Sequence, residues 1–228
     1  MTSSVRWGIP DAVWAFVGGL AGAILAAVPF SRHDISAETA TFLAATFIGQ
    51  YGATVLVLVL ISHRKGLGTL AADFGLRIRL SDAWMLGGGL VLGGALGLFL
   101  APLSSLAGGK EQAVVQQLNN SSGPKLVVLA IGAGAIAPIV EELLFRGLLL
   151  RALLRRVQAP AAVAISATAF GLVHVLLDPS IGSVVALPGL TAVGMVSGVL
   201  AVRSGDLSRS IFLHAGFNAL AILQVVVS

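Results

Sequence analysis

The chain has 228 residues, of which 57% are hydrophobic and 11% charged, and its mean hydropathy is +0.97. Soluble domains carry about 25% charged residues, so this composition excludes an ordinary soluble domain and indicates an integral membrane protein. The net charge of +4 does not indicate nucleic-acid binding, because the basic residues lie in short segments between apolar runs. The absence of cysteine excludes disulfides, thiolate metal ligands and cysteine nucleophiles.

Apolar stretches long enough to cross a bilayer recur along the whole sequence. A spanning helix needs about 17–25 such residues, and no polar stretch between the runs is long enough to be a linker between modules. We therefore expect an all-α fold, a polytopic transmembrane helical bundle of about seven spans in one structural domain. The predicted spans are 11–30, 40–62, 83–106, 126–150, 160–177, 185–202 and 209–227.

Local patterns add three expectations. The third span carries Gly89, Gly93 and Gly97 at intervals of four residues, a spacing that lets two helix backbones approach closely, so we expect these glycines to serve packing. Segment 63–82 mixes basic and apolar residues and predicts an interfacial helix on the membrane surface. Segment 107–124 is the longest polar connection, and its Asn-Asn-Ser-Ser-Gly-Pro end predicts a loop before the fourth span.

The basic residues predict the orientation of the chain. If the spans alternate in direction, eleven of the 14 basic residues fall on one side, which the positive-inside rule makes cytoplasmic. The N-terminus is then cytoplasmic and the C-terminus is not. Richness in Ala, Gly, Val and Leu favours a bacterial source and hence a bacterial inner membrane. The eleven are Arg6, Arg64, Lys65, Arg77, Arg79, Arg146, Arg151, Arg155, Arg156, Arg203 and Arg209.

Two adjacent carboxylates, Glu141 and Glu142, lie inside the fourth apolar run. An ionisable residue inside a membrane span costs a few kcal/mol, so such a pair indicates either a structural ion pair or a functional site. Glu142 and Arg146 are four positions apart with the acid first, the favourable order for a helical ion pair. Glu141 points about 100° away and has no basic residue three or four positions from it, so it is the better candidate for a proton acceptor.

Two histidines also lie within apolar runs, His174 in the fifth and His214 in the seventh. A single buried histidine is more often structural than catalytic, but polar groups in lipid need partners and converge inside the bundle. His214 and Asn218 share one helix face, as do Phe170 and His174, and the phenylalanine is expected to pack. Counted along straight helices, His174 lies deeper than His214, which predicts a broken helix or shifted boundaries.

These side chains supply what amide hydrolysis requires. Glu141 can take a proton from water, His174 can hold that water, and His214 with Asn218 can donate hydrogen bonds to the developing oxyanion. The sequence contains neither a G-x-S-x-G elbow nor an H-E-x-x-H pair, the markers of serine hydrolases and zincins. No cofactor is expected.

The three groups of residues resemble a known set of motifs. Glu141 to Arg146, Phe170 to His174 and His214 to Asn218 are similar to EExxxR, FxxxH and HxxxN of the CPBP family, which contains CAAX prenyl endopeptidases of the Rce1 type and bacterial proteases linked to bacteriocin processing or immunity. The resemblance implies a catalytic helical core over residues 125–228 and an intramembrane glutamic endopeptidase. The catalytic residues expected from the motifs are Glu141, Glu142, Arg146, His174, His214 and Asn218. Residues 1–124 carry spans without a recognised motif.

Other functions stay open at this point. A metal-dependent protease would use zinc bound by Glu141, His174 and His214, although asparagine is a poor zinc ligand. A transporter would also place Glu and His inside the membrane, and an immunity scaffold would keep the fold without the chemistry. The expected partners are the lipid bilayer and a peptide or protein substrate within or at the membrane, with no nucleic acid; prenylated proteins and bacteriocin-like peptides are both compatible.

Overall fold

The computed structural model describes residues 5–31 and 39–227 of the chain. Every regular element in these ranges is helical, which confirms the all-α prediction. Within them, six helical segments are long and apolar enough to cross a membrane: Ile9–Ser31, Ala40–Lys65, Leu80–Leu106, Gly123–Leu154, Ala159–Leu177 and Ile181–Ser204. The last predicted span, 209–227, also forms one helix, α11 (Ser208–Val227), although it is not among those six. Helices are expected here because lipid offers no partner for backbone N–H and C=O groups.

The helices form two compact units, and each unit combines two separate parts of the chain. The first unit contains residues 1–77 and 122–156, and the second contains 78–121 and 157–228. Both units therefore take residues from either side of position 124, where the sequence divides into regions without and with motifs. That functional division stays a prediction.

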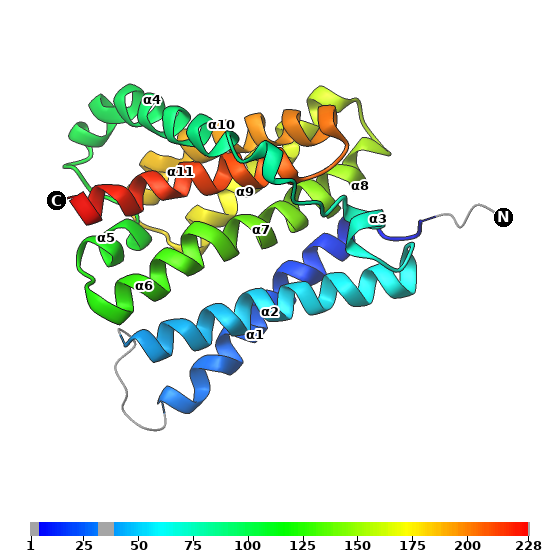
Figure 1. The fold of residues 1–228 in the computed structure, drawn as a ribbon, viewed down its shortest axis with the longest axis horizontal. Coiled ribbons are helices and arrows are strands. Elements are labelled where there is room, and N and C mark those ends of the chain that lie inside the picture. The colour runs from blue at the N-terminus through cyan, green and yellow to red at the C-terminus, as the bar shows by residue number, and fades with distance from the viewer. Residues whose placement is uncertain (1–4, 32–38, 228) are drawn as a thin grey trace. The chain divides into compact units, whose positions relative to one another are not determined.

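The first unit contains a tight pair of long helices, α1 and α2, which lie side by side (Figure 1). The two backbones meet at Gly22 and Gly49, because a Cβ atom on Gly22 would lie 2.2 Å from the backbone oxygen of Gly49. The green segments from α6 to α8 continue one another in Figure 1 and carry the glutamates. The elements of this unit are α1 (Ile9–Ser31), α2 (Ala40–Lys65), α3 (Leu70–Phe74), α6 (Gly123–Ile131), η2 (Gly132–Ile136), α7 (Ala137–Glu142), η3 (Leu143–Leu150) and α8 (Arg151–Leu154).

Asp73 of α3 joins three parts of the first unit at one end. Its carboxylate accepts hydrogen bonds from the Trp7 indole at 2.9 Å and the Ser62 hydroxyl at 2.6 Å, and from the backbone N–H of Leu67 at 2.8 Å. Burial raises the pKa of Asp73, but hydrogen bonds, first among them the one from Ser62, outweigh burial and hold that pKa below its ordinary value. The buried carboxylate thereby ties the start of the chain to the end of α2.

The prediction of one interfacial helix over 63–82 is wrong. Helix α2 runs on to Lys65, and only α3 and the short 3₁₀ turn η1 (Leu80–Asp82) follow in that segment. Gly68 has φ of 90° and Gly75 ends α3 in the left-handed region with φ of 73°, conformations that interrupt a helix and suit glycine. The hydrogen bonds from Ser62 and from the backbone N–H of Leu67 to Asp73 then hold this interrupted segment against the end of α2.

Basic side chains gather where α1 begins and α2 ends. Arg6 donates to the backbone oxygen of Arg64 at 2.9 Å, Lys65 pairs with Asp11 at 2.5 Å, and the Arg155 guanidinium lies 4.1 Å from the centre of the Trp7 ring. This grouping agrees with the charge pattern from which the orientation was predicted. The cytoplasmic placement of the N-terminus stays a prediction.

The second unit places α4 directly against α11. A Cβ atom on Gly89 would lie 2.0 Å from the backbone oxygen of Leu213, and one on Gly216 would lie 2.1 Å from that of Leu86, so the two backbones touch. The packing role predicted for Gly89 is confirmed, as is that of Gly93, whereas Gly97 meets nothing within 4 Å. The elements of this unit are η1, α4 (Met85–Leu106), α5 (Ala113–Asn119), α9 (Ala159–Leu177), α10 (Ile181–Ser204) and α11.

The polar connection 107–124 is partly helical, because α5 lies within it. Residues 120–122, directly before α6, are not helical.

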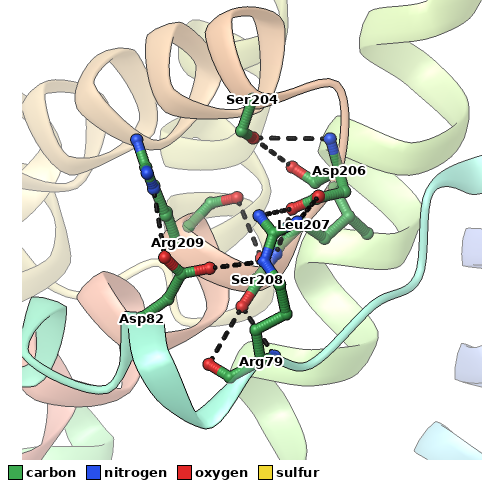
Figure 2. Close-up of polar contacts among 8 residues, drawn as sticks. Arg79, Asp82, Ser204, Asp206, Leu207, Ser208 and Arg209 are labelled. Atoms are coloured by element: carbon green, nitrogen blue, oxygen red, sulfur yellow. Dashed lines mark hydrogen bonds and ion pairs between the residues drawn. The ribbon is translucent and has the colours of Figure 1, made fainter.

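A polar cluster fixes where α11 starts (Figure 2). Arg79, just before η1, forms ion pairs with Asp82 at 3.0 Å and with Asp206 at 2.8 Å, and Asp82 also pairs with Arg209 at 3.2 Å. The backbone N–H of Arg79 donates to the Ser208 hydroxyl at 2.9 Å. The start of α4 is thus bound to the connection between α10 and α11.

We predict that Gly89→Ala lowers the thermal unfolding temperature of the purified protein in detergent. The added methyl group would overlap the backbone of α11, and forced overpacking typically destabilises by about 1–3 kcal/mol. Gly97→Ala in the same helix is the matched control and should be neutral or stabilising by about 0.5–1 kcal/mol, because alanine restricts the unfolded chain more than glycine does. Equal unfolding temperatures for the two variants would contradict the close crossing of α4 and α11.

Candidate active site

The glutamates lie on a helix whose hydrogen-bond pattern changes twice. The stretch from Gly123 to Leu154 is continuous, but η2 and η3 are π-helical and enclose the short α-helical segment α7, which ends at Glu142. Pro138 lacks an N–H and its ring crowds the carbonyl four residues earlier, so a wider turn just before it relieves that conflict. π-Helical turns are rare and occur frequently at functional sites, which draws attention to α7.

Glu142 and Arg146 form the predicted ion pair. The Arg146 Nη1 lies 3.1 Å from the Glu142 Oε1, and both side chains are 0% exposed. Two unlike charges buried together stabilise one another, whereas either one alone would be buried at a high free-energy cost. The pair therefore has a structural role that fixes the rotation of this helix.

Glu141 has different surroundings from its neighbour. It is half-buried, and the Tyr51 hydroxyl of α2 donates a hydrogen bond to its Oε1 at 3.4 Å. Tyr51 was not singled out from the sequence, although it is the only tyrosine in the chain and lies inside an apolar span. The isolated phenol could have indicated a contact of this kind, because a hydroxyl group within a membrane span needs a hydrogen-bond partner.

The histidines meet around one aromatic ring in the second unit. Phe170 of α9 is buried, and its ring lies 4.6 Å from the His174 ring and 5.4 Å from the His214 ring of α11, centre to centre. The Phe170 and His214 rings stand at 90° to each other, an edge-to-face arrangement that aromatic rings favour. Phe170 packs as expected, and its ring contacts both imidazoles.

The backbone sets how the His174 ring is protonated. Its Nδ1 lies 2.8 Å from the backbone oxygen of Phe170, and since a carbonyl oxygen only accepts, Nδ1 must carry the hydrogen. In the neutral imidazole, Nε2 is then a hydrogen-bond acceptor. His214 is only 2% exposed, and Asn218 follows it by one turn of α11.

The helix break expected near the histidines is absent from α9 and α11, whereas the fourth and sixth predicted spans have other boundaries, Gly123–Leu154 and Ile181–Ser204. α9 and α11 are continuous, and their bounds lie within one residue of the predicted ones. Counting residues along two helices gives the relative depth of two side chains in the membrane only if both helices start at one level and run parallel. Long side chains can also bridge part of a difference in depth.

The structure thus describes two groups of candidate residues. Glu141, Glu142 and Arg146 belong to the first unit, and His174, His214 and Asn218 belong to the second. Within the described residues of each unit, no group of three or more His, Asp or Glu side chains is arranged to hold a metal ion. The alternative zinc set combines Glu141 of one unit with two histidines of the other.

The fold defines a polytopic membrane protein that carries two glutamates and two histidines within its helices. More particularly, residues 123–220 match the family model described as type II CAAX prenyl endopeptidase Rce1-like. The match covers the stretch that carries all three motifs and agrees with the resemblance that they predicted. It runs from the first residue of α6 into α11. The comparisons with curated proteins and with solved structures find no match.

We predict that Glu142→Ala destabilises the protein more than Glu141→Ala does. The first change removes the carboxylate at 3.1 Å from a fully buried guanidinium, and breaking such a pair typically costs about 3–5 kcal/mol. The second changes a half-buried residue, and changes at functional residues are often neutral or stabilising for the fold. Thermal unfolding of both purified variants in detergent measures the difference; equal stability would mean that the two glutamates do not divide their roles in this way.

Proposed function

We propose that this protein is a metal-free intramembrane endopeptidase in which Glu141 activates water. The observation that carries the proposal is the unequal environment of two adjacent carboxylates. Glu142 is fully buried against Arg146, whereas Glu141 is half-buried and accepts a hydrogen bond from a phenol. Where the environments of two neighbouring acids differ, their chemical roles are expected to differ too.

The proposed reaction begins with the proton acceptor. Glu141 takes one proton from a water molecule, and Nε2 of His174 accepts a hydrogen bond from the other water hydrogen. The water oxygen attacks the carbonyl carbon of the scissile peptide bond, forming a C–O bond and an oxyanion. The tetrahedral intermediate collapses as the C–N bond breaks, and the proton held by Glu141 passes to the leaving amine.

The remaining residues are assigned to the oxyanion. His214 and Asn218 share one face of α11, so both can direct donors at one oxygen. Such donors are most effective when they are held rigidly before the reaction. The packing of His214 against Phe170 and the tight crossing of α11 with α4 support that assignment. The proposal requires both groups of residues to act on the same peptide bond.

The substrate is proposed to be a protein or peptide at the membrane. The name of the matching family refers to CAAX prenyl substrates, so a farnesylated CAAX peptide with a quenched fluorophore is the first probe, and its unprenylated counterpart is the second. If neither peptide is cleaved, the membrane peptides of a deletion strain can be compared with those of the parent. Failure of both approaches would contradict the protease proposal and favour the transporter or scaffold alternatives.

We predict that Glu141→Gln and His174→Ala abolish cleavage, whereas Asn218→Ala leaves measurable activity. Glutamine keeps the volume of glutamate but cannot accept the water proton, and His174→Ala removes the group that holds the water. Asn218 shares its role with His214, and loss of one oxyanion donor typically lowers kcat by about 10²–10³-fold.

The cleavage assay is run in proteoliposomes, with circular dichroism and size-exclusion profiles to verify that each variant folds. Gly97→Ala is the control, because a Cβ atom added at that position would meet nothing within 4 Å. Turnover by Glu141→Gln close to that of the wild type would overturn the glutamate mechanism.

We predict that cleavage persists after exhaustive chelation. In the proposed mechanism Glu141 and His174 activate water directly, and the amide of Asn218, a poor zinc ligand, serves as an oxyanion donor. Activity and metal content are measured on the same chelator-treated sample. Loss of activity that added zinc restores would instead assign Glu141, His174 and His214 to a metal site.

A further inference from the structure

Tyr51 contacts Glu141 and lies outside all three motifs. It belongs to α2, and it precedes the segment 123–220 that matches the protease family. Its hydroxyl donates to Glu141 Oε1 at 3.4 Å, across 90 positions of sequence. This separation is long for an O–H···O hydrogen bond, as is common for catalytic contacts before substrate binds.

Aromatic packing holds Tyr51 in place. Its ring stacks on Phe47, one helical turn earlier, with ring centres 5.9 Å apart and an angle of 20° between the planes. Phe47 in turn lies against Gly132, the first residue of η2, where an added Cβ atom would be 2.5 Å from the Phe47 ring. The missing side chain at Gly132 lets α2 approach the helix that carries the glutamates. Tyr51 is therefore placed by α2 packing rather than by a loop.

We propose that Tyr51 is a positioning residue for Glu141. By donating to Oε1, the phenol restricts rotation of the carboxylate and presents it to the water in one orientation. A hydrogen bond to an ionised acceptor is stronger than one between neutral groups, so this restraint is strongest before Glu141 takes the proton. Orientation matters because a displacement of about 1 Å at a reacting group can lower the rate by about 10²-fold. The inference rests on the proposed role of Glu141.

The first experiment tests the contact without any substrate. Because Tyr51 is the only tyrosine, protein grown with ring-labelled tyrosine gives an infrared phenol C–O band from this residue alone. We expect the band of folded wild-type protein to shift in Glu141→Gln, which exchanges a charged acceptor for a neutral one. It should stay in place in the control Gly97→Ala, where the added Cβ atom would meet nothing within 4 Å. An unchanged band in Glu141→Gln overturns the inference, whatever the protein cleaves.

The second experiment tests the effect on catalysis. Tyr51→Phe should lower kcat by about 10–100-fold, the range for loss of one hydrogen bond to a charged group, and should leave KM within about twofold. Thr46→Val is the matched control, because it removes a hydroxyl of the same helix that donates to Phe42 and Leu43 within α2. We expect its kcat to stay near that of the wild type.

The two readouts distinguish the possible failures. A shifted band together with wild-type kcat in Tyr51→Phe would overturn the positioning role while leaving the contact intact. Equal loss of kcat in Tyr51→Phe and Thr46→Val would assign the effect to general damage in α2 and would also overturn it. A wild-type protein that cleaves no probe and no membrane peptide would contradict the proposed function itself, and the infrared band would still report the contact.

Discussion

The buried pair of Glu142 and Arg146 is the interaction on which the geometry of the first unit depends. Both side chains lie on one face of the same helix and are fully buried, so this face must be turned towards the protein and away from lipid. That requirement fixes how the helix is rotated about its own axis. Glu141, about 100° further round, then meets α2 and the Tyr51 hydroxyl. A structural ion pair thus determines where the neighbouring acid points.

In the second unit, helix packing and ion pairs hold the side chains of α11 in place. The α11 helix is held at its start by the ion pairs of Arg79 and Asp82, and along its length by the glycine contacts with α4. Phe170 supplies a rigid ring against which both imidazoles rest. Side chains held by packed helices are more precisely oriented than side chains on loops, and this favours their use in donating hydrogen bonds to a developing charge.

Hydropathy and spacing were sufficient to predict the helical spans, the Glu142–Arg146 pair and the motif residues, because each depends on neighbours within one helix. The π-helical turns around α7 were not predicted, since they change the hydrogen-bond partner of a residue without changing the hydrophobic pattern. The course of segment 63–82 depends on the bond from Trp7 to Asp73, 66 positions apart, and the Tyr51 contact spans 90. Contacts at such separations leave no periodic signal in one sequence.

The kind of partner given to each glutamate fits the role proposed for it. A guanidinium holds the opposite carboxylate in a buried ion pair, which suits Glu142 as a structural residue. A phenol donates one hydrogen bond without adding a positive charge. Its contribution to Glu141 is therefore mainly one of direction, because the hydrogen bond restrains the orientation of the carboxylate. The phenol comes from α2, outside the segment 123–220, so the proposed positioning of Glu141 gives the N-terminal part of the chain a role in preparing the base.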